Sequence, residues 1–179
     1  MSDQDKNLAK QVIAEIVRQA GGQLDNKTNL FKAFYLAHLI YADRQPGYLT
    51  FWPIVRMPRG PGIDRSDVLI GELIAEEVLT VKQLDYGDFH GFRFELTGNC
   101  PDAAKLSPEA IEAISLAVKF VDGKSAEEVS DFSHRLSKTW QEAQNGEELN
   151  IYVDAIPEDE YRQREARMTE IASIFSEEG

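Results

Sequence analysis

The sequence predicts a mainly α fold of the α+β class, a compact helical domain that carries one winged-helix-like β-hairpin and ends in an acidic helix. A strongly apolar stretch at 30–41 is interrupted only by Lys32 and His38, so the helix it forms must be buried on nearly every side. Apolar residues alternate at 79–84 and again at 92–96, on either side of a loop rich in glycine and aspartate. This pattern is typical of two paired strands and predicts the hairpin.

Start and stop signals mark the other helices. Asn26 is a suitable N-cap for the buried helix, and Ser107 followed by Pro108 is a typical helix start. Ser125 and Glu128 form a capping box ahead of an amphipathic stretch. In chain order, helices are predicted at 5–20, 26–43, 64–77, 107–121, 125–136 and 139–143.

Three helices followed by a hairpin is the element order of a winged helix. In that interpretation the helix at 64–77 buries Val68, Leu69, Leu73 and Ile74 and presents its other face to the DNA major groove. Its acidic residues would be repelled by phosphate, since only Arg65 opposes Asp64, Asp67, Glu72, Glu76 and Glu77. A winged-helix DNA-binding regulator is therefore the alternative function, and we do not expect nucleic acid as a partner.

A proline-rich turn precedes this helix. Residues 52–62 hold three prolines and two glycines, which excludes a helix and predicts a fixed turn. Residues 48–55 read as a short extended piece that Pro53 confines to a sheet edge or excludes from a sheet. Tryptophan and arginine beside a rigid turn are typical interface anchors, although such a loop can also be pinned to its own core. The predicted partner-binding residues are Trp52, Arg56, Arg59, Gly60 and Pro61.

Composition places the chain among globular cytoplasmic proteins. Its 179 residues are 42% hydrophobic and 28% charged, which is enough apolar material for a buried core. No apolar run is long enough to span a membrane, and the polar N-terminus has no signal-peptide pattern. A single cysteine, Cys100, fits a reducing compartment and excludes an internal disulfide.

The net charge of −12 is concentrated in the second half of the chain. Residues 1–90 hold ten basic against twelve acidic residues, whereas residues 91–179 hold nine against nineteen. Between Arg44 and Arg65, by contrast, four arginines face only Asp64. The acidic half either serves solubility or forms a face for a basic partner.

The sequence offers no constellation of catalytic or metal-binding residues. His38, His90 and His134 are far apart, and Cys100 has no second cysteine nearby. The Arg59-Gly60-Pro61-Gly62 turn lacks the lysine and hydroxyl residue that end a phosphate-binding loop. We therefore expect no enzyme activity, no cofactor and no metal site.

The C-terminal region reads as an acidic extension. Pro157 begins a last helix in which Tyr161, Met168, Ile171 and Phe175 recur at heptad-like spacing. From Gln141 onward, eleven acidic residues stand against three arginines. We predict a helical domain at 1–152 and an extension at 153–179, which either docks on its own domain or pairs with a partner.

Several of these segments together resemble a known family. The apolar helix at 30–41, the Trp52 segment leading to Gly60 and Pro61, and the stretch Val129 to Ala143 with His134 and Trp140 are similar in order to the SocA-like Panacea antitoxin domain. The resemblance covers roughly 26–152. It implies a helical, non-enzymatic domain that neutralises a toxin partner or acts as an adaptor for a protease.

The residues that carry the resemblance have two interpretations each. A histidine and a tryptophan on one amphipathic segment usually pack against their own domain, so we expect a structural role for His134 and Trp140. The alternative is that both belong to a recognition surface. Gly60 and Pro61 match the family at the turn, and the resemblance names neither the partner nor the oligomeric state.

Overall fold

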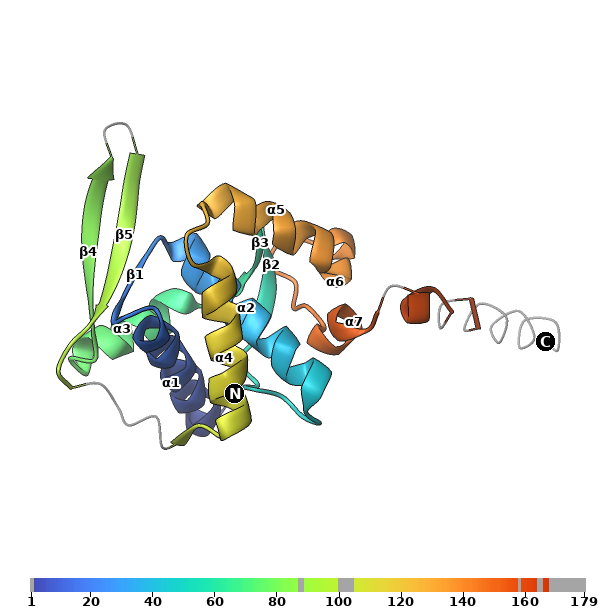
Figure 1. Cartoon of the computed structure of the whole chain (residues 1–179), viewed down its shortest axis with the longest axis horizontal. Coiled ribbons are helices and arrows are strands. Elements are labelled where there is room, and N and C mark those ends of the chain that lie inside the picture. The colour runs from blue at the N-terminus through green and yellow to red at the C-terminus, as the bar shows by residue number, and fades with distance from the viewer. Residues whose placement is uncertain (1, 87–88, 100–104, 158, 164–165, 168–179) are drawn as a thin grey trace.

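The computed structural model describes residues 2–86, 89–99, 105–157, 159–163 and 166–167. With 58% helix and 16% strand, it has the predicted mainly α, α+β class (Figure 1). The helices are α1 (Asp3–Gln19), α2 (Lys27–Arg44), α3 (Ser66–Ala75), α4 (Pro108–Val121), α5 (Ala126–Leu136), α6 (Lys138–Glu142) and α7 (Ile151–Ala155). The strands are β1 (Gln23–Asp25), β2 (Ile54–Met57), β3 (Gly60–Ile63), β4 (Leu79–Tyr86) and β5 (Phe89–Leu96).

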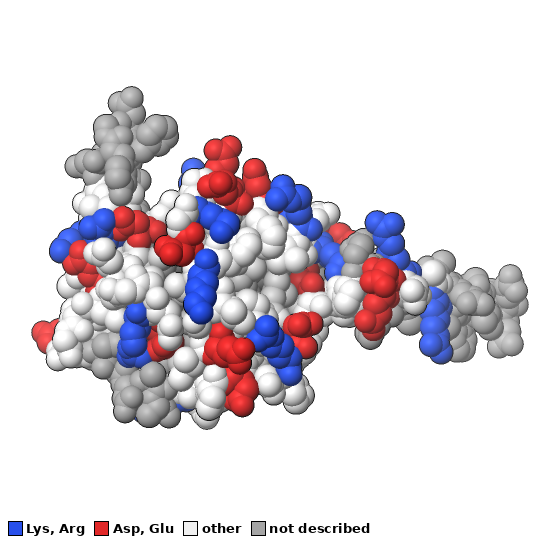
Figure 2. All heavy atoms as spheres, viewed as in Figure 1, with Lys and Arg blue, Asp and Glu red and all other residues white. Residues whose placement is uncertain are grey.

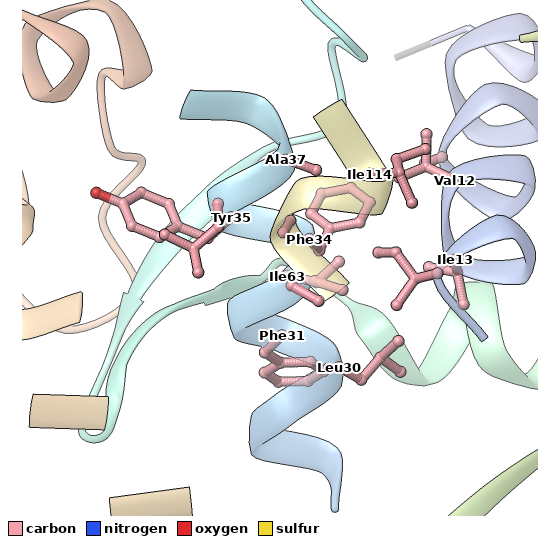
Figure 3. Close-up of a cluster of buried hydrophobic side chains, with 14 of the residues drawn as sticks. Val12, Ile13, Leu30, Phe31, Phe34, Tyr35, Ala37, Ile63 and Ile114 are labelled. Atoms are coloured by element: carbon pink, nitrogen blue, oxygen red, sulfur yellow. The ribbon is translucent and has the colours of Figure 1, made fainter. Parts of the chain in front are cut away.

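Helix α2 lies at the centre of the fold, as its apolar sequence predicts. It contacts α1, α4, α5, α7 and β3, so apolar side chains are needed on nearly all of its faces. Phe34 points toward α1 and α4, whereas Tyr35 points to the opposite side with its hydroxyl group toward the C-terminal elements (Figure 3). Alanines of α4 at positions 110, 113 and 117 are buried and allow that helix to approach α2 closely.

The β4–β5 hairpin stands at one side of the helices (Figure 1). Its strands pair from Leu79↔Leu96 to Tyr86↔Phe89, so the loop is shorter than the predicted loop at 85–91. Backbone pairing continues through Asp85↔His90, where the apolar alternation used for the prediction has already ended. Strand β1, which the sequence analysis missed, pairs with β5 and gives the sheet order β1-β5-β4.

The proline-rich segment forms a second hairpin and not only a turn. Strands β2 and β3 pair antiparallel, with Arg56 opposite Pro61. The Arg56 N–H donates to the Glu147 carbonyl oxygen over 2.8 Å, and the Arg56 carbonyl accepts from Gly146 N–H over 2.8 Å. Both backbone groups of Arg56 therefore face away from β3, and the missing N–H of Pro61 leaves no hydrogen bond unmade.

The buried face of α3 differs from the prediction. Leu69, Ile70 and Leu73 are buried, whereas Val68 and Ile74 are 40% and 44% exposed. The helix has apolar residues on more than one side, so its sequence does not decide which side faces the core. Packing on α1 selects the side that contains Ile70.

Glu72 of α3 and Glu76, the residue that caps its C-terminal end, form ion pairs with α1. Glu72 lies 2.8 Å from Lys6 and 3.1 Å from Lys10, and Glu76 lies 2.5 Å from Lys10. The Lys6 hydrogen bond is the main cause that lowers the pKa of Glu72. These two acidic residues therefore link α3 to α1, so repulsion of a nucleic acid is not their only effect.

A buried carboxylate links helix α7 to the helical body. Asp154 is 4% exposed and accepts hydrogen bonds from Tyr35 Oη over 2.9 Å, Ser137 Oγ over 2.6 Å and Thr139 N–H over 2.9 Å. The helix continues across the boundary predicted between residues 152 and 153. The heptad positions Met168, Ile171 and Phe175 and the lone Cys100 lie outside the described residues.

Candidate functional site

The core of the candidate site is a buried lysine beneath the β2–β3 turn. Lys32 is 1% exposed, and its Nζ donates to the Pro61 carbonyl oxygen over 2.8 Å. Burial lowers the pKa of Lys32 from 10.5 to about 7, because the charged form loses its hydration. Lys32 makes no salt bridge with any residue that the structure describes. The sequence signal for this residue was a cation inside an apolar helix.

Gly60 allows the turn to lie directly on this lysine. Its φ is +94°, a conformation that favours glycine. A Cβ atom at this position would lie 2.6 Å from Lys32 Nζ, 2.6 Å from Ser133 Oγ and 2.9 Å from His134 Cδ2. Residues from α2, β3 and α5 therefore meet at a point where no side chain fits.

Three predicted residues form a stack beside the same turn. The rings of His134 and Trp140 are parallel to within 8°, with centroids 4.0 Å apart. Arg56 covers Trp140 with its guanidinium 4.7 Å from the ring, and its Nε donates to the Trp140 carbonyl over 3.2 Å. Trp140 Nε1 donates to the Met57 carbonyl over 2.9 Å. The stack therefore joins β2 to α5 and α6.

Helix α5 holds the tip of the hairpin through backbone contacts. Ser130 Oγ donates to the Arg59 carbonyl over 2.6 Å, while the Arg59 side chain stays exposed.

Burial is the main cause that lowers the pKa of His134, and the positive charge of Lys32 lowers it further. Its Nε2 is buried without a hydrogen-bond partner among the described residues. The structure thus joins Arg56, Gly60, Pro61, His134 and Trp140 in one cluster.

Trp52 lies apart from this cluster. It is 5% exposed, and its Nε1 donates to the Asp64 carbonyl oxygen over 2.7 Å. Pro61 is also buried, so neither residue offers surface to a partner. Among the predicted contact residues, Arg59 is exposed and Arg56 is half-buried.

A groove of about 1030 Å³ opens beside the hairpin tip. The sequence analysis did not find it, because its walls come from distant segments that no local pattern connects. Phe92 of β5 is 42% exposed on one wall. The groove is lined by residues 25–29, Phe31, Lys32, 57–60, Gly91, Phe92, 124–127, Ser130 and Asp131.

A second hollow of about 450 Å³ lies between the end of α2 and the segment before α7. Tyr48 and the 63% exposed Phe51 border it, with ring centroids 4.8 Å apart. At its base, His38 is hydrogen-bonded to the Phe34 carbonyl and to Thr50 Oγ1 over 2.8 and 2.9 Å. Burial lowers the pKa of His38 to about 4, so this imidazole is neutral at physiological pH.

Charge is mixed over the surface. Basic and acidic side chains alternate across the face in Figure 2, so this view shows no continuous acidic face for a basic partner. Within the described residues, no three histidine, cysteine or acidic side chains are grouped closely enough to hold a metal ion. None of the described helices is both long and apolar enough to cross a bilayer.

The chain was compared with protein families, curated proteins and solved structures. No family model, no curated protein and no solved structure matches the chain.

Proposed function

We propose that the chain is a non-enzymatic protein-binding module of the cytoplasm, acting as an antitoxin that neutralises a toxin or as an adaptor that delivers a partner to a protease. The antitoxin role rests on the resemblance of the 26–152 region to the Panacea domain. The binding role rests on one structural observation, the groove beside the β2–β3 turn. It has an exposed aromatic wall at Phe92 and an exposed cation at Arg59.

The hairpin that borders the groove supports this proposal because it is rigidly held. Its backbone is hydrogen-bonded to Lys32, Ser130, Trp140 and the 146–149 segment. A surface fixed in this way loses little conformational entropy when a partner binds. Arginine and phenylalanine are also among the residues enriched at protein interfaces.

The experiment is co-expression with the product of the neighbouring gene. We expect that product to arrest growth alone, to be neutralised by the chain and to co-purify with it. Replacing Arg59 with glutamate should weaken the purified complex roughly tenfold, about 1.4 kcal/mol, as expected for an interface arginine. The matched control is Arg135→Glu on α5, an exposed residue that does not line the groove. A neighbour that is neither toxic nor bound would contradict the antitoxin role.

A winged-helix DNA-binding regulator is the second candidate. It is favoured by the order α1, β1, α2, α3, β4, β5 with sheet order β1-β5-β4, into which the β2–β3 hairpin is inserted. The exposed side of α3 argues against DNA binding. It consists of Asp67, Val68, Gly71 and Ile74, none of which carries a positive charge that could contact a phosphate. Salt-sensitive binding of duplex DNA at physiological ionic strength would favour this candidate over the first.

A further inference from the structure

We propose that the groove beside the β2–β3 turn binds a segment of a partner protein in which a carboxylate lies next to an apolar side chain. This inference rests on the proposed protein-binding function and specifies the chemistry of the partner. The net charge alone would suggest a basic partner, whereas this groove would bind an acidic segment of the partner.

The apolar half of the site is a wall of aromatic surface. Phe92 is 42% exposed on β5, and Phe31 of α2, which is 9% exposed, lines the same groove. Met57 at the end of β2 adds a flexible thioether to the same lining. An exposed phenylalanine at a concave surface is a favourable contact for an apolar side chain, because both lose water on binding.

The charged half of the site is a set of three cations. Lys27, Arg59 and Lys124 line the groove from α2, the hairpin tip and the start of the α5 region. None of the three forms a salt bridge with a residue that the structure describes. The acidic residue Asp25, which also lines the groove, is already engaged by Arg93 over 2.5 Å.

Lys32 provides an independent indication of an anion. It is 1% exposed, lines the groove and donates to a neutral carbonyl oxygen, with no carboxylate among the described residues to balance its charge. Burial lowers the pKa of Lys32 to about 7, so the residue is only partly charged at neutral pH, and a carboxylate held in the groove would favour its charged form. The first turn of α2 contains no acidic residue, so the positive end of this helix is not neutralised by its own side chains.

The same surface favours a protein segment over a nucleic acid. Glu127 and Asp131 line the groove on the α5 side, and they would repel a chain of phosphates. A single carboxylate can lie against Lys27 and Arg59 while its neighbouring apolar side chain rests on Phe92. Stacked bases could use the aromatic wall, but their phosphate backbone would have to pass those acids and a chain of charge −12.

The test is an NMR titration of the isotope-labelled full chain with phenylpropionate, a small probe that carries both features. Phenylpropanamide is the neutral control and phenylpropylamine the cationic one. We expect backbone amide shifts confined to Thr28, Asn29, Gly60, Phe92 and Ala126, with the acid binding roughly fivefold more tightly than the amide because charge-assisted hydrogen bonds are the stronger kind.

Variants assign the two halves of the site. Lys27→Gln combined with Arg59→Gln should remove the preference for the acid, and Phe92→Ala should weaken acid and amide alike. Lys119→Gln, an exposed lysine of α4 outside the groove, is the matched control and should change neither.

Three results would overturn the inference: equal affinity for acid and amide, shifts that map elsewhere, or no shift at about 20 mM, beyond the range expected for a ligand of this size. A duplex DNA oligonucleotide that displaces phenylpropionate would also overturn it, by assigning the groove to nucleic acid. If the neighbouring-gene product binds the chain but leaves bound phenylpropionate undisturbed, the protein-binding function stands and the groove is not its site.

Discussion

The indole of Trp140 and the imidazole of His134 are stacked 4.0 Å apart, and the same indole donates a hydrogen bond to the Met57 carbonyl oxygen. One side chain thereby joins α5 and α6 to β2. The two residues lie six positions apart in the sequence. Ser137, which lies between the two residues in the sequence, explains this spacing. It caps the start of α6 by accepting from Trp140 N–H, and the chain turns there so that Trp140 stacks on His134.

Replacing Trp140 with phenylalanine should keep an aromatic ring beside His134, remove the hydrogen bond to Met57 and reduce the ring surface in contact with Arg56. We expect the free energy of unfolding to fall by about 1–2 kcal/mol, the cost of leaving a part-buried carbonyl without its donor. Urea denaturation followed by circular dichroism measures this change. An unchanged midpoint and slope would show that the bond contributes nothing. Arg59→Ala, at an exposed side chain, should leave stability unchanged and serves as the control.

Among the described glycines with a positive φ, Gly60 should be the one at which substitution by alanine destabilises the chain most. Gly146 has a similar φ of +85° with nothing within 4 Å of an added methyl group, so Gly146→Ala isolates the backbone cost, about 1–2 kcal/mol. Gly60→Ala adds the clash with Lys32 and Ser133, a further 1–3 kcal/mol, roughly, for overpacking. Thermal unfolding of the two variants measures the difference. Equal losses would mean that the turn can move off the lysine.

Lys32 should make stability rise with pH above neutrality. Its pKa is about 7 in the folded chain and 10.5 ordinarily, so between these values the unfolded chain binds more protons than the native one. The free energy of unfolding therefore increases with pH across this window, by at most about 1.4 kcal/mol per pH unit. Below pH 7 both states are protonated and this contribution is constant.

Urea denaturation at pH 7.5 to 9.0, roughly the lower half of this window, tests the Lys32 effect against Lys32→Met, which should lose the rise. His134 does not interfere, because its lowered pKa places its titration below this range. The pKa of Tyr35 is raised by burial, so its native hydroxyl stays protonated there as well. A variant that keeps the full slope would assign the pH dependence to another group.

Asp154→Ala should release α7 and cost about 3 kcal/mol or more, because Tyr35, Ser137 and Thr139 would lose a shared buried acceptor. Tyr35→Phe removes one of these donors and should cost about 1 kcal/mol. Hydrogen exchange at Val153 and Asp154 reports the release directly. If exchange there is unchanged in Asp154→Ala, contacts other than the carboxylate hold the helix.

Local signals in the sequence predicted the helices well. The capping box of Ser125 and Glu128 and the Ser107-Pro108 start appear in the structure as predicted, because each is satisfied within one turn. The central place of α2 followed from its composition alone. The buried side of α3 did not, since Val68 and Ile70 are equally apolar and only the position of α1 separates them.

The candidate site was predicted only in part, because its geometry depends on contacts between distant segments. The motif residues Gly60, Pro61, His134 and Trp140 were identified, yet nothing in their spacing shows that they meet above Lys32. The β2–β3 hairpin looked like an isolated turn because its outer edge is completed by the 146–149 segment. The groove needs Phe92 and Lys124, which no motif connects.

The completion of β2 by the C-terminal third of the chain has a consequence for biosynthesis. Ser130 lies 71 residues beyond Arg59, and Trp140 lies 83 residues beyond Met57. When only the segment from α1 to β5 has left the ribosome, the β2–β3 hairpin therefore still has the outer edge of β2 unpaired. Such long-range pairing is slow to form and exposes apolar surface while it waits. Translation must pass Leu149 before the outer edge of β2 can form its hydrogen bonds.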